Sequence, residues 1–272
     1  MSKILLIDSY NMIHRAHHGF SFGDHSTTFG FFRCLKSEID RHNPDKVFLV
    51  SEGYPKHRFT KFGDYKSNRT KKRDDSFSRQ KKDIFDISKN LPVTIIRHPD
   101  YECDDVIGML CRDYCENNEV VICSSDSDFI QLLDLDNVKL WNPIRKTFID
   151  RWPVNYLMWK SLKGDPSDNI PGVKGVGDKT AHKLALDLDL FKLQITDNPV
   201  KKAEYDISYS LIELADICNK DKSINRSDYS FNESITKEAF QERNFKSIVG
   251  KSWEKWKISM ENLNERCKKA SN

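Results

Sequence analysis

Short apolar runs alternate with longer amphipathic stretches over the first 150 residues of the chain. The runs are rich in Ile, Val and Leu and cover residues 3–7, 46–50, 93–96, 119–123 and 138–141. Runs of this length, separated by helical periodicity, are typical of strands in a parallel sheet with helices on both faces. The pattern therefore predicts an α/β fold built on a doubly wound parallel sheet.

Beyond about residue 151 the strand pattern fades and helical periodicity takes over. Apolar residues recur at helical spacing over 154–162, 179–186, 201–218 and 252–266. We therefore expect an α/β domain over residues 1–150, followed by a smaller helical part over residues 151–272.

The composition of the 272 residues, with 11% aromatic and 31% charged residues, is that of a globular protein. The longest apolar runs are far shorter than the roughly 18 residues that a membrane-spanning helix needs. Only four apolar residues separate Lys3 from Asp8, too few for a signal peptide, and the seven cysteines form no CxxC pair. We therefore expect no membrane segment, reduced thiols and a cytoplasmic location.

The net charge of +3 is unevenly distributed along the chain. Residues 56–82 contain eleven Lys or Arg and three acidic residues, a net charge of +8. Aromatic residues stand among these cations, at Phe59, Phe62, Tyr65 and Phe77. Cations that hold phosphates, beside rings that stack on bases, are typical of a surface that binds single strands. A solvated loop is the alternative that a charge run alone leaves open.

Acidic residues follow four of the five predicted strands. They are Asp8, Glu52, the group Glu102, Asp104 and Asp105, and the pair Asp126 and Asp128. A further pair, Asp165 and Asp168, lies in the segment 164–170. Acids at helix starts also serve as caps and complement the helix dipole. Because the carboxyl ends of parallel strands meet at one edge of a sheet, we expect these acids to converge, and hard oxygen ligands suit Mg²⁺ or Mn²⁺.

A glycine-rich turn over residues 171–181 opens the next predicted helix. It is similar to a Walker A loop, but Asp178 separates Gly177 from Lys179 and no strand precedes the turn. Gly172, Gly175 and Gly177 would let the backbone approach a phosphate closely, with amides of the helix start as donors. A helix-hairpin-helix, which holds a nucleic-acid backbone without reading bases, is the better interpretation.

Five motifs occur in one order along the chain: Leu6–Asp8, Asp64–Arg69, Glu102–Asp105, Ser124–Asp128 and Gly164–Ile170, followed by the glycine-rich turn. This order resembles the phage and bacterial 5′-nuclease family of flap endonucleases and 5′→3′ exonucleases, which includes free-standing enzymes called phage RNase H. The resemblance covers residues 4 to about 187. It implies a PIN-like α/β nuclease domain, a helical arch over residues 56–90, and a helix-hairpin-helix over about 164–187.

The resemblance implies two divalent metal ions, normally Mg²⁺ with Mn²⁺ as a substitute. The residues that match the tighter site are Asp8, Glu102, Asp104 and Asp126, and those that match the second are Asp128, Asp165 and Asp168. Asp105, which we also count among the metal-site residues, matches a family acid that supports the metal through the ligands. Where the family usually has an aspartate after the second strand, this chain has Glu52. We expect Glu52 to bind metal with altered reach or through water.

The resemblance also implies contacts with nucleic acid. Lys66 resembles the arch lysine that faces the scissile phosphate, with Arg58 and Arg69 as further phosphate contacts. The hairpin resembles the element that holds the downstream duplex, often with a bound K⁺. The residues expected to bind DNA are Tyr65, Lys71, Lys72, Arg73, Gly172, Lys174, Gly175, Gly177 and Lys179. The implied partner is DNA with a 5′ flap or 5′ end, or an RNA–DNA hybrid, and the implied enzyme is a monomer in the cytoplasm of a bacterium or of a phage host.

The implied activity is metal-dependent phosphodiester hydrolysis in replication and repair, and two other interpretations stay open. One is a module that holds branched DNA without cutting it, and the other is a PIN-type single-strand ribonuclease. The acids argue against the first, because a repulsive cluster has no purpose without cations. The second leaves the hairpin and the helical part unexplained. Cleavage of a flap in Mg²⁺ but not in EDTA would separate the three.

Overall fold

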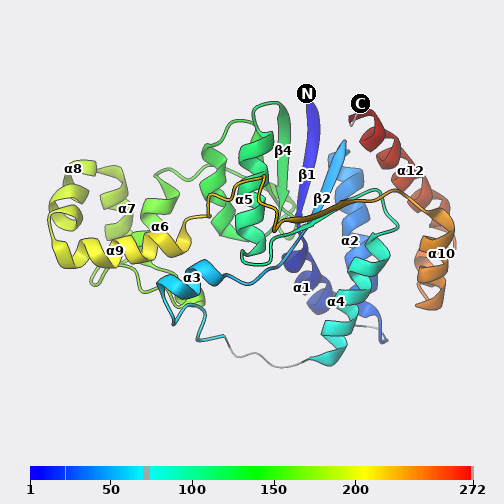
Figure 1. Cartoon of the computed structure of the whole chain (residues 1–272), viewed down its shortest axis with the longest axis horizontal. Helices are drawn as coiled ribbons and strands as arrows, with labels where there is room; N and C mark the ends of the chain where they lie inside the picture. The colour runs from blue at the N-terminus through cyan, green and yellow to red at the C-terminus, as the bar shows by residue number, and fades with distance from the viewer. Residues whose placement is uncertain (22, 70–73, 271–272) are drawn as a thin grey trace.

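The computed structural model describes residues 1–21, 23–69 and 74–270, and these form a mixed α/β structure (Figure 1). Its seven-stranded sheet has the order β6-β5-β4-β1-β2-β3-β7. The strands are β1 (Ser2–Asp8), β2 (Lys46–Ser51), β3 (Thr94–Arg97), β4 (Asn118–Cys123), β5 (Val138–Asn142), β6 (Thr147–Ile149) and β7 (Asn225–Asp228). The five central strands are parallel and the two edge strands antiparallel. The predicted α/β class is confirmed, and each predicted strand is present within a residue or so of its expected bounds.

Helices cover both faces of the sheet. They are α1 (Ser9–Gly19), α2 (Ser26–His42), α3 (Lys56–Lys61), α4 (Asp75–Ser88), α5 (Cys103–Tyr114), α6 (Tyr156–Lys163), α7 (Asp178–Leu186), α8 (Leu188–Phe191), α9 (Pro199–Ile212), α10 (Glu233–Glu242), α11 (Lys246–Val249) and α12 (Trp253–Ala270). Two 3₁₀ helices, η1 (Ser127–Asp134) and η2 (Pro166–Asp168), and a π-helix, η3 (Lys192–Thr196), complete the set. None of the described helices is both long and apolar enough to cross a membrane.

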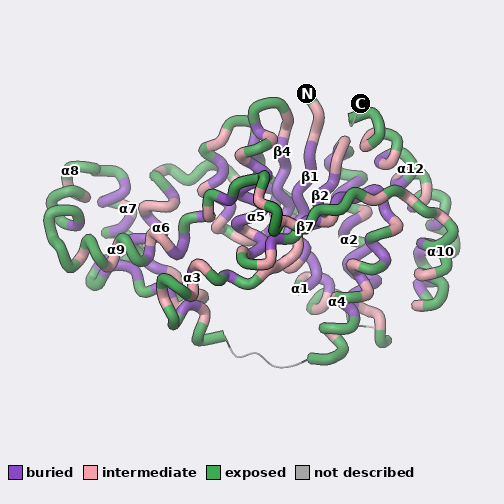
Figure 2. Tube along the Cα trace, viewed as in Figure 1, coloured by how far each residue is buried: buried purple, intermediate pink, exposed green. Residues whose placement is uncertain are grey.

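Strand β1 shows why the sheet has two cores. Its buried side chains alternate, so that Ile4 and Leu6 pack with α5, η1, α6 and α7, while Leu5 and Ile7 pack with α1, α2, α4 and α12. This period of two is the geometry of a strand that is buried on both faces. Figure 2 shows the buried residues gathered along the strands between the two layers of helices.

Residues 151–270 do not form the one separate helical part that the sequence led us to expect. Helices α6 to α9 gather at one end of the molecule, as a helical part would, but the chain then crosses back to the sheet (Figure 1). There β7 pairs antiparallel with β3, and Trp253, Trp256 and Met260 join the core beneath α2. Residues 225–270 thus belong to the α/β body, a return that the polar sequence of β7 gave no reason to expect.

The predicted arch, residues 56–90, lies between β2 and β3 along the chain. After β2 the chain forms α3, a turn over residues 63–68 and α4. Residues 70–73, which include Lys71, Lys72 and Arg73, lie outside the described residues. Asp74 caps the start of α4, because its carboxylate accepts a hydrogen bond from the backbone N–H of Phe77.

Candidate functional site

The acidic residues meet at the carboxyl ends of the central strands, where several of them also cap helices. Asp8 ends β1 and accepts the backbone N–H of Asn11 at the start of α1, at 3.0 Å. Asp126 accepts the backbone N–H of Asp128 at 2.9 Å and so starts η1. The hydroxyl of Ser124 donates to Asp8 at 2.8 Å, which joins the ends of β4 and β1. Capping therefore fixes these carboxylates at one edge of the sheet.

Burial, with repulsion from neighbouring acids as a smaller cause, raises the pKa values of these carboxyl groups. Burial raises the pKa of Asp8 to about 6, and the charge of Asp126 adds to the effect. Burial and the charge of Glu102 raise the pKa of Glu52 to about 7. Desolvation, together with Asp126 and Glu52, raises the pKa of Asp104 well above its usual range. These residues come from β1, β2, α5 and β4, and they form the convergent cluster that the strand pattern predicts.

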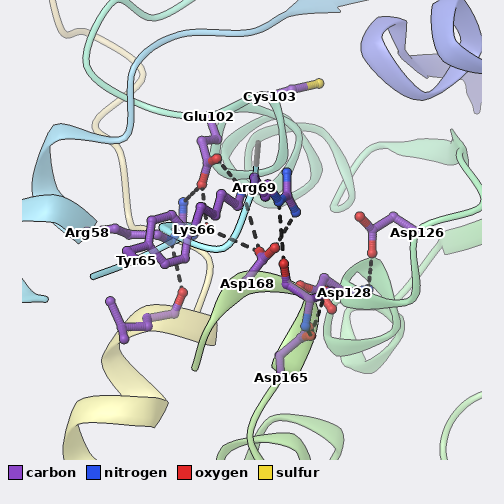
Figure 3. Close-up of polar contacts among 12 residues, drawn as sticks. Arg58, Tyr65, Lys66, Arg69, Glu102, Cys103, Asp126, Asp128, Asp165 and Asp168 are labelled. Atoms are coloured by element: carbon purple, nitrogen blue, oxygen red, sulfur yellow. Dashed lines mark hydrogen bonds and ion pairs between the residues drawn. The ribbon is translucent and has the colours of Figure 1, made fainter. Parts of the chain in front are cut away.

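The chain's own cations neutralise the other side of the cluster (Figure 3). The ammonium of Lys66 donates to Glu102 and lies 3.5 Å from an oxygen of Asp168, and the guanidinium of Arg69 donates to the other oxygen of Asp168. Burial alone would lower the pKa of Lys66, but Glu102 and Asp168 outweigh it and raise that pKa. Lys66 is therefore a fixed positive charge among the predicted metal ligands.

Lys160 pairs with two acids of the predicted second metal site. This buried lysine on α6 donates to Asp128 and lies 2.8 Å from an oxygen of Asp165. Burial raises the pKa of Asp128 to about 6 although Lys160 opposes it. For Asp165, hydrogen bonds from Lys160 and Ser167 outweigh burial and lower the pKa to about 2. The sequence interpretation missed Lys160, whose signal was a lone charge among the buried positions of an amphipathic helix.

The segment 64–69 docks onto the segment 165–169. The backbone N–H of Lys66 donates to the carbonyl of Asp168 at 2.9 Å, and the amide of Asn68 donates to the carbonyl of Pro166 at 2.7 Å. In return, the amide of Asn169 donates to the carbonyl of Asp64 at 2.8 Å. Lys66 adopts a left-handed backbone with φ of 55°, uncommon for a residue other than glycine. These contacts hold its ammonium over the acids.

Tyr65 lies in a different place from that expected of a DNA contact. Its side chain is buried, and its hydroxyl donates to Glu102 at 2.9 Å. Phe59 and Phe62 pack beside it in a small apolar cluster, while Phe77 contacts His14 and His17 on α1. In this conformation these four aromatic rings pack against the protein. Tyr65 orients a carboxylate, and the expected stacking of bases on these rings has no support here.

Arg58 and Asp105 form a buried ion pair beneath the site. Two nitrogens of Arg58 each lie 2.7 Å from an Asp105 oxygen, and one also donates to Glu102 at 2.7 Å. Both side chains are 3% exposed or less, and the remaining Nε of Arg58 donates to the carbonyl of Leu211. The guanidinium has no free face for a phosphate, and Asp105 faces Arg58. For both residues the geometry favours a structural role in place of the expected phosphate and metal contacts.

A tight glycine contact shapes the turn between α6 and α7. Gly164 and Gly172 have φ of +81° and +68°, and a Cβ on either would lie 2.6 Å from the other's backbone nitrogen. The backbone N–H of Val173 donates to the carbonyl of Leu162, so the turn folds back on α6. Lys174 and Lys179 are exposed on the turn and at the start of α7. Two packed helices thus flank a turn that presents two lysines to solvent.

The clustered carboxylates are of the kind that binds divalent metal ions, but in this structure Lys66 and Lys160 form ion pairs with several of them. Within residues 1–21, 23–69 and 74–270, no group of three or more His, Cys, Asp or Glu side chains is placed so that it could hold a metal ion. The donor set still fits a hard cation, because it consists of carboxylates. Burial and the charges of neighbouring acids raise the pKa values of Asp8, Glu52 and Asp104, and a bound cation would remove the repulsion.

The raised pKa values predict how the stability of the metal-free protein depends on pH. A carboxyl group with a raised pKa in the fold contributes stability that is fully present below its unfolded pKa of about 4 and is lost as pH rises through its folded pKa. Between pH 5 and 8 in EDTA, the melting temperature of Glu52→Gln should therefore fall less steeply than that of the wild type. The exposed Glu254→Gln on α12 is the control and should follow the wild type. Parallel curves for all three proteins would contradict the environment described for Glu52.

Comparisons with known proteins place the chain in a family. Residues 3–156 match the family described as 5′-3′ exonuclease, N-terminal resolvase-like domain. The chain is 34% identical over 202 residues to DNA polymerase I of Treponema pallidum, covering 66% of this chain and 20% of the polymerase. It is 29% identical over 245 residues to the 5′-3′ exonuclease of Aquifex aeolicus, covering 81% of this chain and 83% of that protein. The chain thus spans about a fifth to a quarter of the length of the polymerases that it matches.

A solved structure shows the same fold over nearly the whole chain. The T5 D15 protein, co-crystallised with metal ions, has a TM-score of 0.66 and 17% sequence identity, covering 96% of this chain and 99% of that one. The expected resemblance is confirmed by the match over residues 3–156, and this chain belongs to the 5′-3′ exonuclease family.

Proposed function

We propose that this protein is a structure-specific 5′ nuclease that hydrolyses phosphodiesters of 5′-flap DNA, or of RNA primers on DNA, in replication and repair. The observation that carries the proposal is the convergence of acids from β1, β2, α5 and β4, three of which have raised pKa values. Negative charge concentrated in this way suits an enzyme that works with divalent cations. The T5 protein of the same fold was crystallised with metal ions and, in another structure, as a flap endonuclease with DNA and metal ions.

The proposed metal ligands fall into two groups. Asp8, Glu102, Asp104 and Asp126 would hold one Mg²⁺ or Mn²⁺, with Glu52 beside them, and Asp128, Asp165 and Asp168 would hold the other. When bound, such ions would supply Lewis-acid polarisation of water and of the phosphate oxygens. A K⁺ ion at the turn 172–177, a monomeric state and action in the cytoplasm belong to the same proposal.

The chain's own residues prepare the site for this chemistry. Tyr65 orients Glu102 through its hydroxyl, and the pair of Arg58 and Asp105 anchors the start of α5. The ammonium groups of Lys66 and Lys160 neutralise the negative charge of Glu102 and Asp165 in this structure. Incoming divalent cations would take over that role when they bind. Lys66, freed from Glu102, would be placed to pair with the phosphate at which negative charge develops.

Cleavage of a labelled 5′-flap duplex tests the proposal. In Mg²⁺ we expect a released flap that ends in a 3′-hydroxyl and a remaining duplex strand that begins with a 5′-phosphate, and in EDTA no cleavage. Asp128→Asn and Asp165→Asn should still bind the flap but fail to cut it, because each loses a metal ligand and a negative charge near phosphate. Binding without cleavage by the wild type would favour the branched-DNA module. Preferential cleavage of single-stranded RNA would favour the ribonuclease.

The turn between α6 and α7 gives a separate prediction about DNA binding. If Lys174 and Lys179 contact phosphates, neutralising both to Ala should lower the slope of log affinity against log salt by about two. Affinity should change equally for duplexes of different sequence, because phosphate contacts do not read bases. Lys139→Ala is a suitable control, because Lys139 is paired with Glu119 at the other side of the sheet. A slope unchanged by the double substitution would remove the turn from the DNA contact surface.

A further inference from the structure

A pocket opens beside Asp126, on the side of the acids away from the arch residues. Its volume is about 430 Å³, within the range of small-ligand sites. It lies between the end of β4, the hairpin of β5 and β6, and the segment 150–153 that leads into α6. In Figure 3, Asp126 stands apart from Arg58, Tyr65 and Lys66, which approach the cluster from the other side. The pocket therefore continues the site beyond its last acid.

The floor of the pocket is apolar and its rim is aromatic and basic. Ile130 and Leu140 are buried beneath it, with Ile149 beside them. Trp152 is 37% exposed at the rim and packs against Trp159, with ring centroids 4.8 Å apart. The indole is thus held by the protein while part of its surface stays open to a ligand.

Two exposed arginines complete the rim. Arg145 lies in the β5–β6 turn and Arg151 directly before Trp152. In the part of the chain that the structure describes, neither guanidinium pairs with a carboxylate, although Asp150 also lines the pocket. Asn142 shapes this rim, because its side-chain Oδ1 accepts hydrogen bonds from the backbone N–H groups of Ile144 and Arg145, each at 3.0 Å. The unpaired cations leave the rim suited to an anionic group.

We propose that this pocket binds one nucleotide that flanks the phosphodiester held at the acids, with its base against Trp152 and its phosphate beside Arg145 or Arg151. The proposal rests on the proposed nuclease function and adds a subsite to it. An open indole above an apolar floor suits the face of a base, and stacking of this kind tolerates any sequence. The guanidinium groups suit the phosphate. The occupant is therefore an unpaired nucleotide of the nucleic-acid substrate, of any base.

The test combines protein variants with substrates that lack a single base. A set of flap duplexes is prepared, each with a single abasic residue, so that together they cover every position within two nucleotides of the cleavage site. The affinity of each protein for each duplex is measured in Ca²⁺ and in EDTA. Trp152→Ala should weaken binding of the intact substrate by roughly tenfold, the scale of losing one base–aromatic stack. On the substrate that lacks the base bound in the pocket, Trp152→Ala should cause no further loss. Trp152→Phe should keep most of the affinity.

Two further variants guard against a purely structural effect. Phe148→Ala removes an exposed ring on β6 that packs on Trp141, outside the pocket, and should bind like the wild type. Arg145→Ala and Arg151→Ala together change exposed side chains and should lower the affinity and its salt dependence. A 2-aminopurine base at the sensitive position should lose fluorescence on binding to the wild type and keep it with Trp152→Ala.

The outcomes separate this proposal from the proposed function. Losses for Trp152→Ala that are equal on intact and abasic substrates, or equal to those of Phe148→Ala, would overturn the subsite while the wild type still cuts flaps. A wild type that neither binds nor cuts any flap substrate would overturn both proposals.

Discussion

Lys66→Ala should lower the single-turnover rate of flap cleavage by roughly 10², the scale of losing one preorganised electrostatic group. The ammonium of Lys66 is charged, largely buried and held over the acids by the docking of segment 64–69 on segment 165–169. Its removal takes away positive charge where negative charge develops on the phosphate. Saturating enzyme in a rapid-quench experiment isolates this step from affinity.

Lys61→Ala provides the matched control for this prediction. Lys61 is an exposed lysine of α3, and its ammonium donates to the carbonyl of Ser210 at 3.3 Å, away from the acids. The Lys61→Ala enzyme should cut the flap at the wild-type rate when enzyme is saturating. If Lys66→Ala also cuts at that rate, Lys66 has no part in the chemical step and only a binding role is left.

Arg58→Met should destabilise the fold by about 3–5 kcal/mol, because it leaves the carboxylate of Asp105 buried without its partner. The carboxylate of Asp105 accepts hydrogen bonds from both terminal nitrogens of Arg58 and from the backbone N–H groups of Glu102 and Ala215. The two remaining N–H groups cannot compensate for the lost cation in so buried a place. Urea denaturation of the metal-free proteins measures the free energy of unfolding directly.

Arg69→Met is the control for Arg58, because it also breaks an arginine–aspartate pair at the site. The side chain of Arg69 is 54% exposed, so its loss should cost about 1 kcal/mol or less. An additional substitution, Asp105→Asn, should recover part of the stability lost in Arg58→Met, because it removes the unpaired charge. Equal losses for Arg58→Met and Arg69→Met would mean that the buried pair adds nothing to the fold.

The sheet and the convergence of acids could be predicted because both follow from short-range patterns. Buried parallel strands are continuous apolar runs, and Asp8, Glu52 and Asp126 come within a few residues of strand ends. The family resemblance added the order of the motifs, which periodicity alone cannot interpret. The edge strand β6 was missed because it has only three residues, and β7 because its four residues are all polar.

The partners of the charged side chains could not be predicted in the same way. Arg58 and Lys66 lie eight residues apart in one basic segment, yet one is buried under the site and the other holds Glu102 from above. The position of Arg58 depends on α9, where the carbonyl of Leu211, 153 positions away, accepts a hydrogen bond from its Nε, whereas Lys66 is held by the segment 165–169. Contacts of this range leave no local pattern. Lys160 did carry a local signal, a charge among the buried positions of α6, but its pairing with Asp128, 32 positions away, leaves none.

The pairing of β7 with β3 bears on how the protein folds during its synthesis. The acids come from residues 8–168, but residues 225–228 cover the edge of β3, and helices after them fill the core beneath α2. When residues 8–168 have emerged from the ribosome, the growing chain still exposes the unpaired edge of β3 and apolar surface beneath α2. Both promote aggregation. Emergence of residues 225–270 would therefore end a vulnerable period, and a chain cut before β7 should be recovered mainly in the insoluble fraction.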